Sequence, residues 1–120
     1  MAEQKQAAAD IATSADREWT KDELMVKGEA VYKTNCAACH QLEGQGLPPV
    51  FPALAGSAMA TDPDPTAHID IVLNGKAGSA MAAYQDILTD VDLAAVITYE
   101  RNAWGNQASI VQPAEIKAKR

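Results

Sequence analysis

The feature that most constrains the fold of this 120-residue chain is the pentapeptide at 36–40, Cys-Ala-Ala-Cys-His. Two thiols separated by two residues and followed directly by an imidazole are typical of a c-type haem attachment site. Each thiol can add to one vinyl group of a haem, and Ala37 and Ala38 let both sulfur atoms reach the same edge of the ring. Because His40 follows Cys39 directly, its imidazole is carried under the ring, where it can ligate the iron. The pattern predicts one covalent haem c held by Cys36, Cys39 and His40.

Two other chemistries use the same residue types. A dithiol redox pair of the thioredoxin type needs a βαβ context, which this sequence does not indicate. A structural zinc ion needs four Cys or His ligands. The whole chain has two cysteines and two histidines, and the adjacent Cys39 and His40 are awkward ligands for one metal. Haem is therefore the interpretation that we favour.

The composition agrees with a bound cofactor. Hydrophobic residues make up 48% of the chain, yet aromatic residues make up only 5%. Much of the apolar content is alanine, which buries little surface, and a domain of this size has a marginal core. A covalently held porphyrin would supply the large apolar centre that the side chains lack.

The charge and the hydropathy limit the partners. The net charge of −6 argues against nucleic-acid binding, which needs a basic surface, and it suits partners that are reached by electrostatic steering. No apolar run approaches the ~20 residues of a membrane span, so we expect no span in this chain. Residues 1–16 also lack the apolar segment of a secretory signal. Because c-type haem is normally attached outside the bacterial cytoplasm, we expect the signal to be removed, replaced or carried by a larger parent chain.

A first helix is predicted at 21–35. Thr20 and Glu23 form a capping box directly before an apolar-periodic segment. Gly28 lies inside this helix, where a glycine costs about 1 kcal/mol relative to alanine. We therefore expect another helix to approach closely at Gly28. The predicted inner face consists of Leu24, Gly28, Val31 and Tyr32.

Two further helices are predicted later in the chain. Asp64 as N-cap and Pro65 as first residue predict a helix that runs to about residue 73 and ends at Asn74-Gly75. Thr89 and Asp92 predict a third helix, from about residue 90 to residue 103. Its apolar stripe, expected to cross Gly28 and Tyr32, is formed by Leu93, Val96 and Ile97.

The stretch at 41–62 has little periodicity and is rich in glycine and proline. A structureless run of this length is uncommon in a compact domain unless it has a function, such as wrapping a ligand. The side chains expected to pack on the porphyrin are Leu47, Val50, Phe51 and Leu54. The carbonyl of Pro52 is a candidate partner for the second ring nitrogen of His40, with Pro48 and Pro49 as competing candidates.

A second iron ligand is expected in the stretch at 75–84, where small residues surround Met81. A thioether is a soft ligand suited to haem iron, and a Met/His pair raises the reduction potential. Met59, also among small residues, is the rival candidate, and Met25 is not expected to ligate because it lies on the first helix. His68 is a weaker alternative ligand, and we expect it to be a surface histidine or a hydrogen-bond partner instead.

These patterns predict three regions. Residues 1–18 form a linker or N-terminal extension, residues 19–105 form the haem-binding domain, and residues 106–120 form a polar tail. No internal repeat is apparent.

In this arrangement the chain resembles class I cytochromes c. More narrowly, it resembles the haem c domain at the C-terminal end of subunit II in bacterial caa3-type cytochrome c oxidases. The stretches that carry the resemblance are WTKDELM at 19–25, CAACHQ at 36–41, GLPPVFPALAG at 46–56, HIDIVLNG at 68–75 and ITYERNAWGN at 97–106. They span about residue 19 to the C-terminus.

The resemblance implies an all-α class I cytochrome c fold, with three main helices and loops wrapped around one covalent haem c. It implies that Cys36 and Cys39 form the thioether bonds, that His40 is the proximal ligand and that Met81 is the distal ligand. It also implies one-electron transfer from a donor cytochrome or respiratory complex to the CuA centre of a terminal oxidase, on the periplasmic side of the bacterial inner membrane. The copper-ligand cysteines and the two membrane helices of the full subunit are not in this sequence.

Three alternatives remain at this point. The chain could be a free periplasmic electron carrier. It could be a haem enzyme or gas sensor with a labile distal ligand, although no nucleophile–base pair is apparent and we expect no catalysis of its own. It could also be an interaction module that binds no haem.

Overall fold

The computed structural model describes residues 17–47, 50–79 and 81–120. Its helices are α2 (Lys21–Asn35), α3 (Ala37–His40), α4 (Ala58–Thr61), α5 (Thr66–Asn74), α6 (Asp90–Asn102) and α7 (Pro113–Lys119). Within these described ranges, an isolated bridge between Leu47 and Phe51 is the only β-type pairing. The predicted all-α fold is confirmed. The predicted linker lies almost entirely outside the described residues, as do Pro48 and Pro49.

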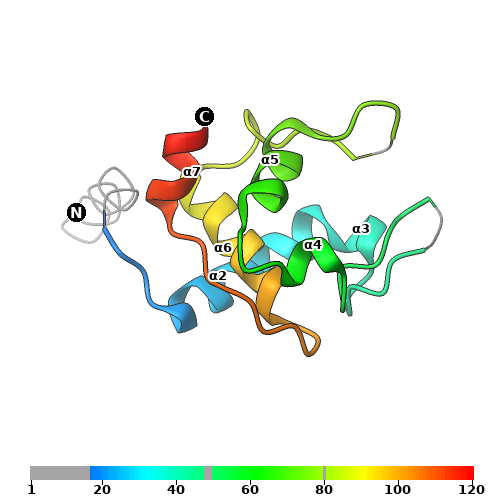
Figure 1. Ribbon diagram of the computed structural model, residues 1–120, viewed down its shortest axis with the longest axis horizontal. Coiled ribbons are helices and arrows are strands. Elements are labelled where there is room, and N and C mark those ends of the chain that lie inside the picture. Colours follow the sequence, from blue (N-terminus) through cyan, green and yellow to red (C-terminus); the bar gives the residue numbers. More distant parts are fainter. Residues whose placement is uncertain (1–16, 48–49, 80) are drawn as a thin grey trace, which may run out of the picture.

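Helices α2 and α6 cross near the middle of the molecule, and Gly28 lies at the crossing (Figure 1). A Cβ atom on Gly28 would lie 2.1 Å from the carbonyl oxygen of Ala95 and 2.7 Å from Cβ of Tyr99. The expected close approach is therefore present, and only glycine fits it. The expected partner face was wrong, because Gly28 meets Ala95 and Tyr99 and not the predicted stripe. That stripe is buried within the core and consists of Leu93, Val96 and Ile97.

The helix starts follow the predicted local signals. Thr20 accepts a hydrogen bond from the backbone N–H of Glu23, and the Glu23 carboxylate accepts one from the N–H of Thr20, so the capping box is complete. At α5 the residue before the helix is Pro65, and the Asp64 carboxylate accepts from the N–H of Thr66 at 3.0 Å. Helix α5 therefore begins one residue later than an Asp64 N-cap would place it.

The C-terminal residues are more than a polar tail. Helix α7 lies there, and Val111 and Ile116 are fully buried in the core. The hydroxyl of Thr98 on α6 accepts a hydrogen bond from the N–H of Val111 at 2.8 Å. The sequence pattern missed this contribution because two apolar residues in so short a segment produce no helical periodicity.

Trp19 and Gln112 join the start of the domain to its end. The N–H of Trp19 donates to the side-chain oxygen of Gln112 at 2.8 Å, and the side-chain nitrogen of Gln112 donates to the carbonyl of Trp19 at 2.9 Å. Two loops extend at the opposite end of the molecule from this junction, to the right in Figure 1. None of the helices in the described ranges is both long enough and apolar enough to cross a membrane.

Two buried polar side chains, Arg101 on α6 and Asn106 shortly after its end, hold the loop that precedes α5. Asn106 donates to the carbonyl of Leu54 at 3.0 Å and accepts from the N–H of Gly56 at 2.8 Å. Arg101 donates to the carbonyls of Met59 and Ser109. Because this loop has little regular structure of its own, these bonds to α6 fix its path.

Candidate haem site

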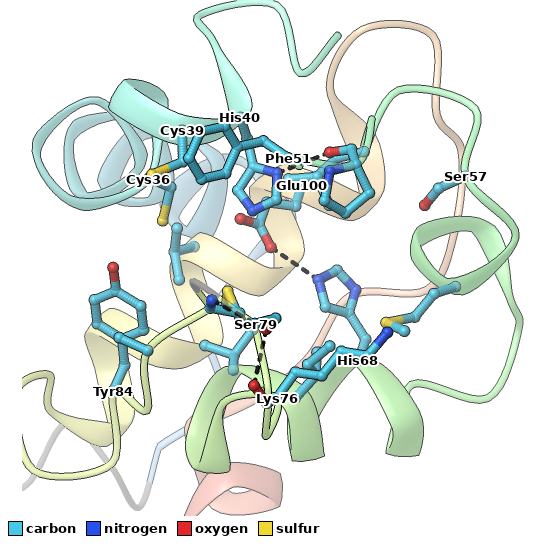
Figure 2. Close-up of a pocket in the computed structure, with 18 of the residues that line it drawn as sticks. Cys36, Cys39, His40, Phe51, Ser57, His68, Lys76, Ser79, Tyr84 and Glu100 are labelled. Carbon is cyan, nitrogen blue, oxygen red and sulfur yellow. Dashed lines mark hydrogen bonds and ion pairs between the residues drawn. The ribbon is translucent and has the colours of Figure 1, made fainter. Parts of the chain in front are cut away.

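The loops and helices enclose a cavity of about 440 Å³, a size typical of cofactor sites (Figure 2). All six residues predicted to bind the cofactor line it, namely Cys36, Cys39, His40, Pro52, Leu54 and Met81. They come from α3, from the loop before α4 and from the loop after α5. The fold thus brings together residues that are up to 45 positions apart in the sequence, from 36 to 81.

His40 is oriented by a backbone carbonyl. Its Nδ1 lies 2.9 Å from the carbonyl oxygen of Pro52, which is the contact that the sequence suggested. A carbonyl can only accept, so Nδ1 carries the hydrogen and Nε2 keeps its lone pair. A histidine in this tautomer can offer Nε2 to a metal, and the bond at Nδ1 fixes the plane of its ring. The competing candidates Pro48 and Pro49 lie outside the described residues.

The two cysteines are free thiols, and both line the cavity. Burial raises the pKa of the Cys36 thiol, and the nearby carboxylate of Glu100 raises it further through its charge and through hydrogen bonding. Cys36 is therefore protonated at neutral pH until its sulfur is alkylated. Within the described ranges, no group of three or more His, Cys, Asp or Glu side chains could hold a metal ion, so the zinc alternative has no ligand set there.

Two methionines line the cavity, Met81 and Met59, whereas Met25 does not. Met81 is partly buried and packs against the core, while Met59 is 38% exposed. The backbone on both sides of Met81 is tied to its own loop, because its N–H donates to the hydroxyl of Ser79 and its carbonyl accepts from the N–H of Lys76. Figure 2 shows His40 on one side of the cavity and Ser79 and Lys76 on the other.

Three of the four loop side chains expected at the porphyrin line the cavity, namely Val50, Phe51 and Leu54. The prediction for Leu47 was wrong. Its side chain is 56% exposed and does not line the cavity, because its backbone pairs with that of Phe51 in a tight turn.

His68 is not a surface histidine. Its side chain is only 2% exposed, and its Nε2 lies 2.8 Å from Oε1 of Glu100 on α6 (Figure 2). The alternative prediction of a hydrogen-bond partner is confirmed. Glu100 also lines the cavity and was not among the predicted site residues. A signal for it exists, since Glu100 lies four residues after Val96 and seven after Leu93, on the apolar face of its helix.

The described residues fit a covalent haem c. Two free thiols, an imidazole with an available Nε2 and a thioether share one cavity, and these are the donor types that such a haem requires. Neither a structural zinc site nor a thioredoxin-type dithiol requires two thiols, an imidazole and a thioether around one large cavity.

Comparison with known proteins agrees with this chemistry. The sequence profile described as "Cytochrome C oxidase, cbb3-type, subunit III" matches residues 23–99. The cytochrome c subunit of the quinone alcohol dehydrogenase of Gluconobacter oxydans is 34% identical over 90 residues, covering 68% of this chain and 19% of that protein. Cytochrome c-552 of Thermus thermophilus is 31% identical over 96 residues, covering 69% of this chain and 72% of that protein.

A third relative is the subunit CcoP of the cbb3-type oxidase of Azospirillum, which is 33% identical over 95 residues, or 30% of that protein's length. The chain spans about a fifth of the length of the dehydrogenase subunit that it matches. Two of these relatives are named as a cytochrome c or a cytochrome c subunit, and the third is named as an oxidase subunit. None of the three is a subunit II of a caa3-type oxidase. The matched residues include the Cys-Ala-Ala-Cys-His motif and the whole length of α2 after its first turn. The chain therefore belongs to the cytochrome c family that includes subunit III of cbb3-type oxidases, and it is a haem c domain that transfers electrons.

Proposed function

We propose that this domain carries single electrons through a haem c ligated by His40 and Met81, and that it delivers them to the CuA centre of a terminal cytochrome c oxidase. The observation that carries the ligand assignment is the cavity itself, which His40 lines from α3 and Met81 lines from the loop after α5. When bound, the haem iron supplies a couple that gains and loses one electron.

The side chains have distinct roles in this proposal. Cys36 and Cys39 tether the cofactor by thioether bonds, and the carbonyl of Pro52 fixes the ring of His40. Met81 supplies the second ligand, and its loop is held by the bonds to Ser79 and Lys76. Because both ligands stay in place, little reorganisation accompanies electron transfer, and Leu54 with the other apolar lining residues keeps water from the ring.

Met59 is the rival for the second ligand. Its greater exposure and its position on the short helix α4 favour Met81, which packs against the core. We predict a His/Met ligand pair with a potential higher than that of a His/His pair.

The proposed acceptor rests on the resemblance of five sequence stretches to the haem c domain of caa3-type subunit II. The match to an oxidase-subunit profile supports a place beside a terminal oxidase. The proposal also places the domain on the periplasmic side of the bacterial inner membrane, as part of a larger subunit or as a domain that docks on one.

In a second candidate function, the domain receives electrons from a dehydrogenase and is defined by its donor instead of its acceptor. The similarity to the cytochrome c subunit of a quinone alcohol dehydrogenase favours a domain that accepts electrons from a dehydrogenase. The similarity to cytochrome c-552 over most of its length favours a free carrier. Both candidates use the same haem site and differ only in the partner.

Stopped-flow mixing of the reduced domain with a soluble oxidised CuA fragment tests the acceptor. We expect electron transfer that is fast at low ionic strength and slows as salt screens the steering charges. Transfer that is no faster than to an unrelated copper protein of equal potential would exclude CuA as the acceptor. Faster reduction of the oxidised domain by a reduced quinoprotein dehydrogenase would support the second candidate.

Carbon monoxide distinguishes an electron carrier from a haem enzyme or gas sensor. If Met81 stays on the iron, the ferrous protein binds carbon monoxide slowly or not at all at neutral pH. Rapid binding by the intact protein would show a labile distal position and would contradict the electron-carrier proposal.

A further inference from the structure

An acidic side chain lies in the interior of the haem site. Glu100 is only 4% exposed, it lines the cavity, and its closest polar partner is Nε2 of His68 at 2.8 Å. It also lies near enough to Cys36 to influence that thiol. A buried carboxylate beside a redox cofactor is costly unless it has a partner, so the pair with His68 calls for an explanation.

The hydrogen-bond pattern of His68 indicates the protonation state of the pair. The other ring nitrogen, Nδ1, is closed off from solvent and has no hydrogen-bond partner in the part of the chain that the structure describes. A hydrogen on Nδ1 would leave a buried donor unsatisfied, which costs about 1–3 kcal/mol. The favoured arrangement is a neutral imidazole whose Nε2–H donates to Glu100. The 2.8 Å distance is typical of a donor facing an ionised carboxylate.

The other charged side chain of the cavity lining is differently placed. Lys76 also lines the cavity, but it is exposed to solvent. Water and salt screen the charge of Lys76, whereas Glu100 acts through the protein interior, where the effective dielectric constant is lower. Of these two charged side chains in the cavity lining, Glu100 is therefore the one whose charge acts on the interior of the site with little screening.

We propose that the Glu100 carboxylate, held in the cavity wall by the hydrogen bond from His68, lowers the reduction potential of the haem. Reduction adds one electron from the donor to the ferric iron, with no bond made or broken, and removes one positive charge from the cofactor. A fixed negative charge nearby stabilises the ferric state more than the ferrous state. The haem therefore has a lower potential than its ligands and its burial alone would give.

The proposal is tested by the variant Glu100→Gln, which keeps the shape of the side chain and an oxygen that can accept from His68. The control is Glu29→Gln, the same chemical change on the exposed face of α2, where Glu29 pairs with Lys33. Spectroelectrochemical titration of the intact holoproteins at one pH and ionic strength gives the potentials. We expect Glu100→Gln to raise the potential by at least roughly four times the shift that Glu29→Gln causes. This factor is the ratio of the dielectric constant of water, about 80, to an effective value of about 20 in the protein.

His68 is a positioning residue in this proposal, and a second pair of variants tests it. His68→Gln retains a donor that can reach Glu100, so its potential stays near that of the wild type. His68→Leu removes the donor that holds the Glu100 carboxylate in the cavity wall, so the charge is no longer fixed there and the potential rises towards that of Glu100→Gln. The double variant Glu100→Gln/His68→Leu then has the same potential as Glu100→Gln alone, since the charge has already been removed.

Two results would overturn the proposal. One is equal potentials for the wild type and Glu100→Gln, which would show that Glu100 does not influence the iron. The other is equal potentials for His68→Gln and His68→Leu, which would show that the donor is irrelevant. The inference rests on the proposed haem ligation, and the ferric absorption spectrum separates the failure of one from the failure of the other. Absence of the iron–sulfur charge-transfer band in the wild type refutes Met81 as a ligand. Presence of the band together with unchanged potentials refutes only the role of Glu100.

Discussion

The crossing of α2 and α6 and the two loops around the cavity are built in opposite ways. At the crossing, the side chains of Leu24, Leu93 and Ile97 are fully buried, and Gly28 admits the backbone of the partner helix to contact distance. In the loops, large apolar side chains such as Leu42 and Val50 remain more than 60% exposed. The helices therefore bury their apolar side chains against one another, whereas the loops leave apolar side chains exposed around the cavity.

The difference shows where the cofactor contributes to folding. Burial of apolar area stabilises by about 25 cal/mol per Å², and the helix crossing gains this from its own side chains. The loop side chains that line the cavity, such as Val50, Phe51 and Leu54, would gain it from a bound porphyrin, while the bonds from Arg101 and Asn106 hold the loop backbone. Regions with few buried contacts open first in native proteins, so we expect the loops to be the less stable part of the holoprotein.

Removal of the covalent attachment has the largest expected effect on this comparison. In the double variant Cys36→Ser/Cys39→Ser neither side chain can form a thioether bond, so a haem-stained denaturing gel shows no band. The single variant Cys39→Ser retains one thioether and a weaker band. Full staining of the double variant would show that these cysteines are not the attachment residues.

Loss of the second ligand is the next largest effect. Met81→Ala abolishes the iron–sulfur charge-transfer band of the ferric protein and lowers the potential, because a soft ligand that favours ferrous iron is removed. Met59→Ala is the matched control, since Met59 lines the same cavity on α4. If Met59→Ala removes the band and Met81→Ala leaves it, the ligand has been assigned to the wrong loop.

Gly28→Val tests the helical half. Its Cβ atom would overlap the carbonyl oxygen of Ala95, so the helices must separate, at a cost of about 3 kcal/mol in the free energy of unfolding. Ala30→Val, on the exposed face of the same helix, should cost less than about 1 kcal/mol through helix propensity alone. Thermal unfolding followed by circular dichroism measures both.

Hydrogen exchange of Gly28→Val compares the stability of the helix crossing with that of the loops. Gly28→Val lowers the protection of α2 and α6, which exchange through global unfolding, and changes the loops less, since these open locally. Equal losses everywhere would mean that the two regions unfold as one unit.

The smallest expected effect is at the start of α2. The backbone N–H of Thr20 and the guanidinium of Arg17 hold the pKa of the Glu23 carboxyl below its ordinary value. Its stabilising contribution is therefore present at neutral pH, above the pKa of the unfolded chain, and is lost as the pH falls through the lowered folded-state pKa. Glu23→Gln should lower the melting temperature slightly at pH 7 and not at all at strongly acidic pH. A pH-independent difference would assign the effect to the hydrogen bonds and not to the charge.

Local signals predicted the parts of the fold that neighbouring residues determine. The thiol spacing at 36–39 and the capping box at Thr20 each require particular residues for a reason that acts within about one turn of chain. The contact of His40 with Pro52 was also within reach, because the two residues are only twelve positions apart in the sequence.

The residues that were missed depend on contacts between distant segments. Glu100 and His68 are 32 positions apart, and each on its own is a polar residue type that is usually found at the surface. Gly28 predicted a close approach, but the rotation of α6 about its own axis decides that Ala95 and Tyr99 meet it. The burial of Val111 and Ile116 likewise follows from the docking of α7, which no local pattern encodes.

The bonded pair Trp19 and Gln112 has a mechanical consequence. Two hydrogen bonds link residues 93 positions apart, at the end of the molecule away from the cavity loops. A pull applied along the flanking chain would load this pair and the helices next to it before it reached His40 or Met81. The junction would thus bear such a load before the residues that line the haem cavity do.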